Sequence, residues 1–357
     1  ISDAIAAGKK TIFVRNGTYL EPDTINIYQD GTSIIGESSG GVKIALQPYT
    51  GFKHSGGIYV SGYKGWYSDG SCRVEQGSAT VTGYAVSWTS DMVGQCIQLG
   101  GDWHEIGAFG DTSTLTLKQP YYGITSTYTE YLIAGFLTGL RLENLSIVST
   151  GAYIGGITLY YVKNAVVKNC ILSQTVDEGL YLNYTIESLI ENNYIEGCGY
   201  YGCNLLNSDH NTIKGNIIKQ NDGDGLYVYY SNNNIIIGNQ ITGNEKTGLV
   251  VYASDYNRIA ENRSNQNGDT GIWTVLDEGN RLKSNVCSSN YNYGILNDGS
   301  SNNSIVGCSA TNNHITGIYI VSGSENTVLI GCHALNNGVS NLVDSGTNTQ
   351  KGYNYAP

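Results

Sequence analysis

The chain has 357 residues, which is too long for one ordinary globular core unless that core is extended along an axis. Its 29 Tyr, 4 Trp and 4 Phe exclude a disordered chain, and its 4 Pro exclude a collagen-like one. With 19 basic and 30 acidic residues the net charge is −11, which argues against nucleic acid, an anionic membrane surface, or a polyanionic substrate unless Ca²⁺ mediates. No stretch approaches the roughly 18 apolar residues needed to span a membrane.

The chain starts at Ile1 without a methionine or signal peptide, so we expect its natural start to lie upstream. Few lysines and many Tyr, Asn, Ser and Thr indicate an extracellular, cell-surface or virion-borne protein rather than a cytosolic one. The 8 cysteines form no CxxC pair, so the sequence predicts no zinc site and assigns no residue to a metal.

Residues 1–62 predict an N-terminal helical cap at Ser2–Ala7 and the first coils of a β-solenoid, because short apolar runs alternate with glycine turns. Residues 63–133 break this pattern and predict a small β insertion domain. Three of the 4 Trp lie there, and TSTLTLKQPYYG has the pattern of a strand that ends in a proline-containing turn. Cys72 and Cys96 either form a disulfide in this domain or stay free.

Residues 134–357 predict a parallel β-helix with 23-residue coils. The repeat is marked by a glycine at the start of each coil: Gly179, Gly202, Gly225, Gly248, Gly271, Gly294 and Gly317. Each coil holds short runs of period two between Asn, Gly, Asp and Ser turns. In GLYVY, for example, Leu226 and Val228 should point inward while Tyr227 and Tyr229 point outward. The fold class is therefore all-β.

Two asparagine columns follow the same 23-residue spacing and are expected to form hydrogen-bonded ladders between coils. One column consists of Asn211, Asn234, Asn257, Asn280, Asn303 and Asn326. The other consists of Asn193, Asn216, Asn239, Asn262 and Asn285, flanked by Cys170 and Cys308.

Three segments resemble known families. AIAAGKKTIFVRNGTYL…GTSIIGES resembles the start of pectin-lyase-like right-handed parallel β-helix proteins. GLYVYYSNNNIIIGNQITGN is similar to repeats of NosD-like periplasmic proteins and of carbohydrate-binding sugar-hydrolase domains. WTSDMVGQCIQLGGDWHEIGAF…STLTLKQPYYG resembles modules of phage tailspikes. The resemblance implies a right-handed solenoid, while the YG-x-DPH motif of alginate epimerases and the NTD…DD…GHG…RIK series of polygalacturonases are absent.

The candidate catalytic residues are acids at the last three positions of their coils: Asp177, Glu178, Asp222, Asp224 and Glu245. Asp222 and Glu245 share a column on adjacent coils, so their backbones should lie about 5 Å apart. Glu178 and Asp224 share another column two coils apart, at roughly 9–10 Å. These spacings are near those of retaining and inverting glycosidases, respectively. Ordinary turn chemistry and Ca²⁺ binding are the alternatives that the acids leave open.

The candidate substrate-binding residues are outward aromatics on the strand that follows these acids: Tyr181, Tyr227, Tyr229, Tyr252 and Trp273. A sugar ring stacks its C–H face on an aromatic plane, so a row at coil spacing could bind an extended glycan. Cross-strand packing, or cover by a loop or another subunit, is the alternative.

We therefore expect a polysaccharide-recognising β-helix protein that cleaves glycosidic bonds like a phage tailspike, as a glycoside hydrolase or polysaccharide lyase. The alternatives are a non-catalytic carbohydrate-binding scaffold or adhesin, and a NosD-like periplasmic accessory protein. No cofactor beyond a Ca²⁺ ion is expected. Polysaccharide is the expected partner, without nucleic acid or membrane insertion, and the resemblance to tailspikes favours a homotrimer.

Overall fold

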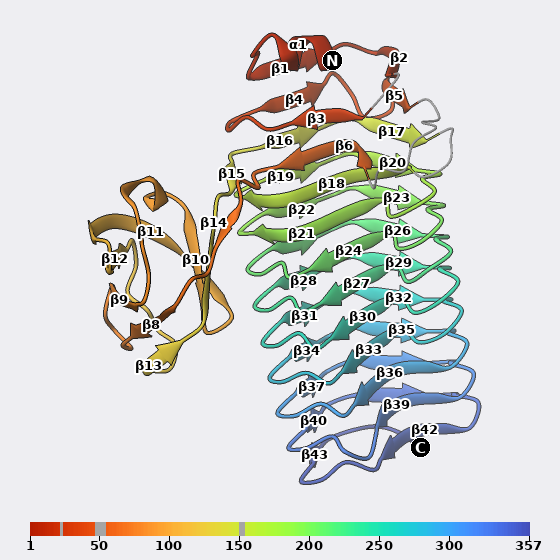
Figure 1. Cartoon of the computed structure of the whole chain (residues 1–357). Helices are drawn as coiled ribbons and strands as arrows, with labels where there is room; N and C mark the ends of the chain where they lie inside the picture. Colours follow the sequence, from red (N-terminus) through yellow and green to blue (C-terminus); the bar gives the residue numbers. More distant parts are fainter. Residues whose placement is uncertain (22–23, 47–54, 150–153) are drawn as a thin grey trace. The chain divides into compact units, whose positions relative to one another are not determined.

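The computed structural model describes residues 1–21, 24–46, 55–149 and 154–357, and it contains two compact units (Figure 1). The first unit comprises residues 1–60 and 139–357, and the second comprises residues 61–138. Each unit has its own sheets and its own buried core, so the two are described separately.

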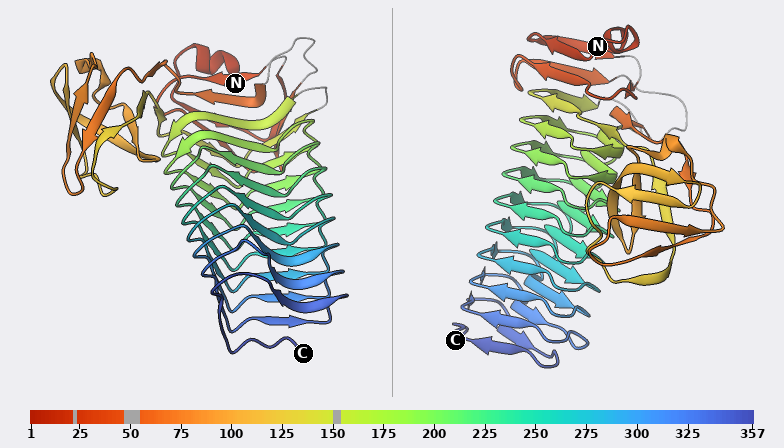
Figure 2. Two further views of the ribbon diagram at one scale, coloured as in Figure 1. Left: turned by 60° about the horizontal axis from the view of Figure 1, so that its bottom comes forward. Right: turned by 90° about the vertical axis from the view of Figure 1, so that its left-hand side faces the viewer.

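The first unit is a solenoid of three parallel sheets, I, II and III, and each coil adds one strand to each sheet (Figures 1 and 2). Sheet I contains β1 (Thr11–Val14), β4 (Ser33–Gly36), β16 (Arg141–Glu143), β19 (Val166–Lys168), β22 (Leu189–Glu191), β25 (Thr212–Lys214), β28 (Ile235–Ile237), β31 (Arg258–Ala260), β34 (Arg281–Lys283), β37 (Ser304–Val306), β40 (Val328–Ile330) and β43 (Gln350–Gly352). Sheet II contains β2 (Gly17–Glu21), β5 (Val42–Leu46), β17 (Ser146–Ser149), β20 (Ile171–Ser173), β23 (Tyr194–Glu196), β26 (Ile217–Lys219), β29 (Gln240–Thr242), β32 (Arg263–Asn265), β35 (Val286–Ser288), β38 (Ser309–Thr311) and β41 (His333–Leu335). Sheet III contains β3 (Ile25–Ile27), β6 (Ser55–Ser61), β18 (Ile154–Lys163), β21 (Leu180–Ile186), β24 (Cys203–Leu206), β27 (Leu226–Tyr229), β30 (Leu249–Tyr252), β33 (Ile272–Val275), β36 (Tyr293–Asp298), β39 (Thr316–Ile320) and β42 (Ser340–Asp344).

The strands have period-two burial, as the sequence predicts. In β27, Leu226 and Val228 are fully buried while Tyr227 and Tyr229 are partly exposed. The buried residues of successive coils stack in register, with Val228 paired to Leu205 of the preceding coil. The predicted all-β, parallel β-solenoid with 23-residue coils is therefore confirmed.

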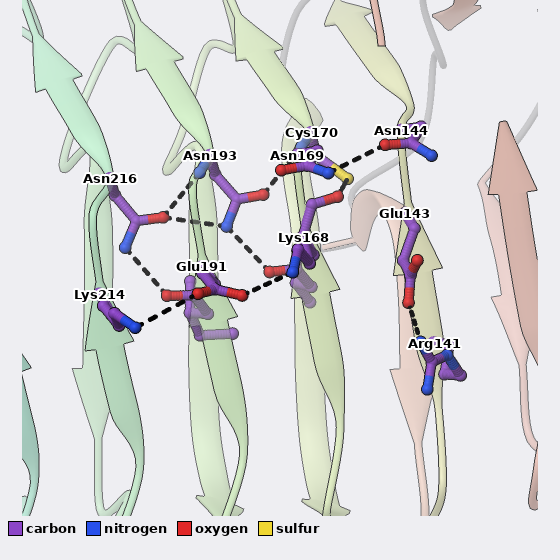
Figure 3. Close-up of polar contacts among 12 residues, drawn as sticks. Arg141, Glu143, Asn144, Lys168, Asn169, Cys170, Glu191, Asn193, Lys214 and Asn216 are labelled. Atoms are coloured by element: carbon purple, nitrogen blue, oxygen red, sulfur yellow. Dashed lines mark hydrogen bonds and ion pairs between the residues drawn. The ribbon is translucent and has the colours of Figure 1, made fainter. Parts of the chain in front are cut away.

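Asparagine ladders connect the coils at the turns (Figure 3). Between sheets I and II, Asn193 Nδ2 donates to Asn216 Oδ1 of the next coil at 3.0 Å and to the Val167 carbonyl of the preceding one at 2.9 Å. Asn239 repeats this arrangement with Asn262 and is fully buried. These ladders satisfy buried turn backbone, so their structural role is confirmed.

In the asparagine column that begins at Asn211, the prediction is wrong at one position, Asn326. β37 pairs with β40 so that Ser304 lies opposite Val328, which places Thr327, not Asn326, next to Asn303. Asn326 is exposed and donates to Asn302 Oδ1. The cause is one additional residue in the coil that begins at Gly317, which makes this step 24 residues; the next step, from Val328 to Gln350, is one residue shorter than the repeat and restores the register.

A third asparagine ladder, which the sequence analysis missed, runs between sheets II and III. It consists of Asn221, Asn244, Asn267, Asn290 and Asn313, all nearly fully buried. This ladder explains the repeated glycine: a Cβ on Gly225 would lie 2.7 Å from Asn244 Nδ2 and 2.4 Å from an Ile241 methyl. The glycine column is therefore needed for close packing against the ladder.

Helix is scarce in the residues that the structure describes. The predicted N-terminal cap is α1 (Ser2–Ala6), and the second unit adds one 3₁₀ turn, η1 (Ser90–Met92). Neither of these helices is long enough to cross a membrane.

The second unit is a small antiparallel sheet with strand order β13-β8-β9-β12-β11-β10-β14-β7. Its strands are β7 (Trp66–Tyr67), β8 (Ser71–Val74), β9 (Thr80–Tyr84), β10 (Cys96–Leu99), β11 (Asp102–Asp111), β12 (Thr114–Leu117), β13 (Ser126–Thr129), β14 (Tyr131–Ala134) and β15 (Leu137–Thr138), the last of these outside the sheet. Trp88 is fully buried at its core and donates to Tyr131 Oη at 3.0 Å. Cys72 and Cys96 are buried and form no disulfide, so the disulfide alternative is wrong.

Candidate functional site

The candidate acids lie in the turns between sheets II and III, directly before the sheet III strands. The backbone of one turn bonds to that of the next: Glu245 N donates to the Asn221 carbonyl, and Gly202 N donates to the Asp224 carbonyl. The structure thus keeps the sequence register, with Asp222 next to Glu245 on adjacent coils. Glu178 and Asp224 lie two coils apart, or about 9–10 Å along the stack.

Glu178 is half-buried in this turn. Asn204 of the next coil donates from Nδ2 to Glu178 Oε1 at 3.2 Å. Burial, followed by the nearby Asp177 carboxyl, raises the pKa of Glu178 to about 7. Burial disfavours the charged form and a like charge adds to the effect, so Glu178 holds its proton to a much higher pH than an ordinary glutamate.

Asp224 is 8 % exposed, and its Oδ1 accepts a hydrogen bond of 2.7 Å from Thr247 N. Burial raises the pKa of Asp224 to about 6, while the Thr247 amide and the charge of Lys246 oppose that rise. Asp224 is therefore ionised more readily than Glu178. The two carboxyls of one column have different proton affinities.

Asp222 and Glu245 are exposed. Asp177 is half-buried beside Glu178. The structure therefore brings Asp177, Glu178 and Asp224 against the solenoid wall and turns Asp222 and Glu245 toward solvent. Which pair reacts is untested by the fold and stays a prediction.

The outward side chains of sheet III form what we call the aromatic face. One column runs Tyr181, Asn204, Tyr227, Val250 and Trp273 on consecutive coils. A second column, two residues further along each strand, includes Tyr160, Asn183, Leu206, Tyr229 and Tyr252. All five predicted substrate-binding aromatics lie on this face and are partly exposed.

The rings on this face contact one another. Tyr227 stacks on Tyr201 with centroids 4.7 Å apart and planes at 1°, and it lies 6.0 Å from Tyr229. Tyr229 contacts Tyr252 edge-on at 5.1 Å. The result is a continuous aromatic strip over adjacent coils, which begins beside Asp224.

Sequence reasoning missed three residues of this site: Tyr201, Asn204 and Asn183. Tyr201 occupies the coil position of Glu178 and Asp224, on the coil between them, and could have been found by reading that column in full. Asn183 Nδ2 donates to Tyr181 Oη at 3.0 Å, and Asn204 Nδ2 holds Glu178. Because the two asparagines interrupt the aromatic columns, the sequence pattern did not mark them as site residues.

Among the residues that the structure describes, no group of three or more His, Cys, Asp or Glu side chains is arranged to hold a metal ion. The site itself offers one carboxyl that can donate a proton and one that can accept a proton. Both lie beside a surface suited to flat, weakly polar rings.

Residues 178–337 match the family model described as a right-handed β-helix region. A search of curated proteins found no match. Together with the three parallel sheets, this match shows that the fold of the first unit is a right-handed parallel β-solenoid.

Solved structures share this fold across nearly the whole chain. The chain is similar to the A-module of mannuronan C-5 epimerase AlgE6 from Azotobacter vinelandii, with a TM-score of 0.63, 15% identity, and coverage of 98% of this chain and 93% of that chain. It is also similar to tailspike gp49 of Pseudomonas phage LKA1, with a TM-score of 0.69, 11% identity, and coverage of 98% and 73%. A third structure, the Gp54 tailspike of Acinetobacter baumannii phage AP22 in complex with capsular saccharide, gives a TM-score of 0.54, 9% identity, and coverage of 99% and 73%. At these identities the likeness extends to the fold alone.

Proposed function

We propose that this protein binds an extended polysaccharide along the aromatic face and hydrolyses a glycosidic bond between Glu178 and Asp224. The observation that carries the proposal is geometric: Glu178 and Asp224 stand in one column two coils apart, a backbone spacing of about 9–10 Å, at the edge of a continuous aromatic strip. A sugar stacked on Tyr227 is within reach of Asp224, three residues earlier in the chain.

The mechanism follows from the different proton affinities of the two carboxyls. Glu178, which keeps its proton, donates it to the glycosidic oxygen as the bond to the anomeric carbon breaks. Asp224, which is ionised, accepts a proton from a water molecule whose oxygen bonds to the anomeric carbon from the opposite side. This backbone spacing is near the upper end of the carboxyl separation of inverting enzymes, and the water would lie over Tyr201 of the coil between the two acids, so we expect the product anomer to be inverted.

The neighbours and the composition support the setting of this reaction. One similar structure holds capsular saccharide, and two of the three are phage tailspikes. With few lysines and many polar uncharged residues, the chain fits an extracellular, cell-surface or virion location, and we propose that it assembles as a homotrimer.

The mechanism needs two carboxyls and no metal, so turnover should survive EDTA. Loss of activity that added Ca²⁺ restores would favour a calcium role for the acidic turns.

The test is incubation with a panel of capsular and plant polysaccharides, with reducing ends and the absorbance of unsaturated uronates as the two readouts. We expect reducing ends alone. Unsaturated products would instead mean a lyase. Binding without either signal would favour the non-catalytic scaffold or adhesin.

Four substitutions then locate the reacting pair on the substrate found. Glu178→Gln and Asp224→Asn should each lower turnover by at least a hundredfold and leave glycan binding largely intact. Asp222→Asn and Glu245→Gln are the matched controls, because they make the same acid-to-amide change at exposed side chains of the turns between sheets II and III. If substituting Asp222 or Glu245 abolishes turnover and substituting Glu178 or Asp224 does not, the reaction runs between Asp222 and Glu245.

A further inference from the structure

We infer that the site selects a neutral glycan and rejects polyuronates; this inference rests on the proposed function and names its substrate class. The property that points to it is the distribution of charge around the solenoid, which is far more uneven than the net charge of −11 indicates.

The aromatic face and the turns that precede it are almost purely acidic. The II–III turns between residues 174 and 317 carry the acids Asp177, Glu178, Asp222, Asp224, Glu245 and Asp269. Against these six carboxyls stands one cation, Lys246. Within the described sheet III strands, the sole Lys or Arg is Lys163, whose Nζ lies 3.5 Å from Glu187 Oε2.

Apart from Lys163 and Lys246, the Lys and Arg residues of residues 139–357 lie on the other two sheets, where several are paired with carboxylates. Figure 3 shows Lys168 of β19 and Lys214 of β25 on either side of Glu191, at 2.8 and 3.6 Å. On sheet II, Lys219 lies 3.0 Å from Glu196. The cations that a polyuronate would need are therefore away from the face that carries the aromatic strip.

Among the described residues, three buried polar atoms on the aromatic face have no hydrogen-bond partner: two acceptors, Asn204 Oδ1 and Asn183 Oδ1, and one donor, Trp273 Nε1. Asn204 is 9 % exposed, its Nδ2 donates to Glu178, and its buried Oδ1 has no hydrogen-bond partner among the described residues. Asn183 is arranged alike: its Nδ2 donates to Tyr181 and its Oδ1 is also unpartnered. Since both oxygens are closed to solvent, a ligand reaches them only when an adjoining side chain turns aside. An acceptor of this kind favours a sugar hydroxyl, which can donate, over a carboxylate, which cannot.

The acidic turns also act against a cationic sugar. An ammonium group beside Glu178 would stabilise its ionised form and remove the proton that the leaving oxygen needs. A uronate would have the opposite defect, because its charge would be repelled by the carboxylates beside the rings on which it must stack. A neutral sugar avoids both.

The experiment uses an array of neutral oligosaccharides of varied linkage, each printed beside its counterpart oxidised at C6 to the uronate, with chitosan oligomers as the cationic class. At about 50 mM salt we expect one or more neutral glycans to bind, with their uronates at least tenfold weaker. At about 0.5 M salt the difference should shrink, because the repulsion is screened.

The outcomes separate this inference from the function on which it rests. A uronate or chitosan oligomer that binds more tightly than every neutral glycan, and is lost in Tyr227→Ala, overturns the substrate class and leaves glycan recognition in place. No binding by any member of the array overturns both.

A pair of variants on one coil tests the open acceptor. Asn204→Val, which copies Val250 of the same column, should weaken binding of the neutral glycan about five- to tenfold. Thr212→Val, a polar-to-apolar change on sheet I of the same coil, should leave binding unchanged. Thermal unfolding serves as the control that both variants fold. If Asn204→Val folds and binds the neutral glycan as tightly as the parent, the role of Asn204 is contradicted.

Discussion

Asp222 and Asp224 are separated by one glycine, yet they face different surroundings. Asp222 is exposed, whereas Asp224 lies against the wall under a hydrogen bond from Thr247. The sequence NDGDG cannot distinguish them, because the direction of each side chain depends on the turn conformation and on the amide of the following coil. The candidate acids were therefore predictable as a group, but the buried pair was not.

The two carboxyls give the reaction a pH profile that can be predicted. With the pKa of Asp224 raised to about 6, activity should fall below that pH as the base takes up a proton. With the pKa of Glu178 raised to about 7, activity should also fall above that pH as the acid loses its proton. Measuring kcat/KM should give a bell-shaped profile, and a rate that is flat from about pH 5 to about pH 8 would contradict these roles.

A third buried carboxyl, Asp277, predicts a pH-dependent stability that is independent of any activity. Asp277 is 5 % exposed and stands in a column that holds serine on the adjacent coils, Ser254 and Ser300. Asn303 Nδ2 donates to its Oδ1 at 2.7 Å, while its Oδ2 has no hydrogen-bond partner among the described residues. Burial raises the pKa of Asp277 to about 6.

Because the folded pKa lies above the unfolded one, the native state binds the proton more tightly, and this stabilisation is lost as pH rises from about 4 to about 6. Asp277→Ser should therefore gain stability relative to the parent as pH increases, by roughly 2 kcal/mol between pH 4 and pH 7. Urea unfolding at both pH values measures it. The idea fails if the difference between the two proteins is the same at both.

At the scale of the coil, the 23-residue period was predictable because most columns repeat without a break. The columns of Tyr181 and Asn193 hold in the structure for that reason. Asn326 was misplaced because one added residue is invisible to a fixed spacing. The orientation of Asn183 and Asn204 also lay beyond the sequence, since it depends on partners one coil or two residues away.

The asparagine ladders predict a specific cost for removing one member. Asn239→Leu should lower the free energy of unfolding by about 1–3 kcal/mol, because the Ile213 carbonyl and the Asn239 side-chain partners lose their bonds inside the wall. Gln240→Leu serves as the control, since Gln240 follows Asn239 in the chain and is exposed on sheet II. Chemical denaturation that finds Asn239→Leu as stable as the parent would show that the ladder does not stabilise the fold.

At the scale of the whole molecule, we expect association into a homotrimer. Val339, Tyr353 and Tyr355 of the last coil are 74%, 97% and 56% exposed, and exposed apolar side chains favour burial against another chain. Sedimentation at micromolar concentration should give three times the 38.4 kDa of one chain. A monomer of 38.4 kDa under these conditions would refute the trimer and leave the proposed chemistry untouched.

The central claim is that a glycosidic bond is cleaved between Glu178 and Asp224. Time-resolved proton NMR of a digest reads the configuration of the first product before it mutarotates. A backbone spacing of about 9–10 Å, near the upper end of the carboxyl separation of inverting glycosidases, predicts the inverted anomer as the initial product, and its appearance should be lost in Glu178→Gln. A retained anomer would contradict this pair and point instead to carboxyls about 5 Å apart, such as Asp222 and Glu245.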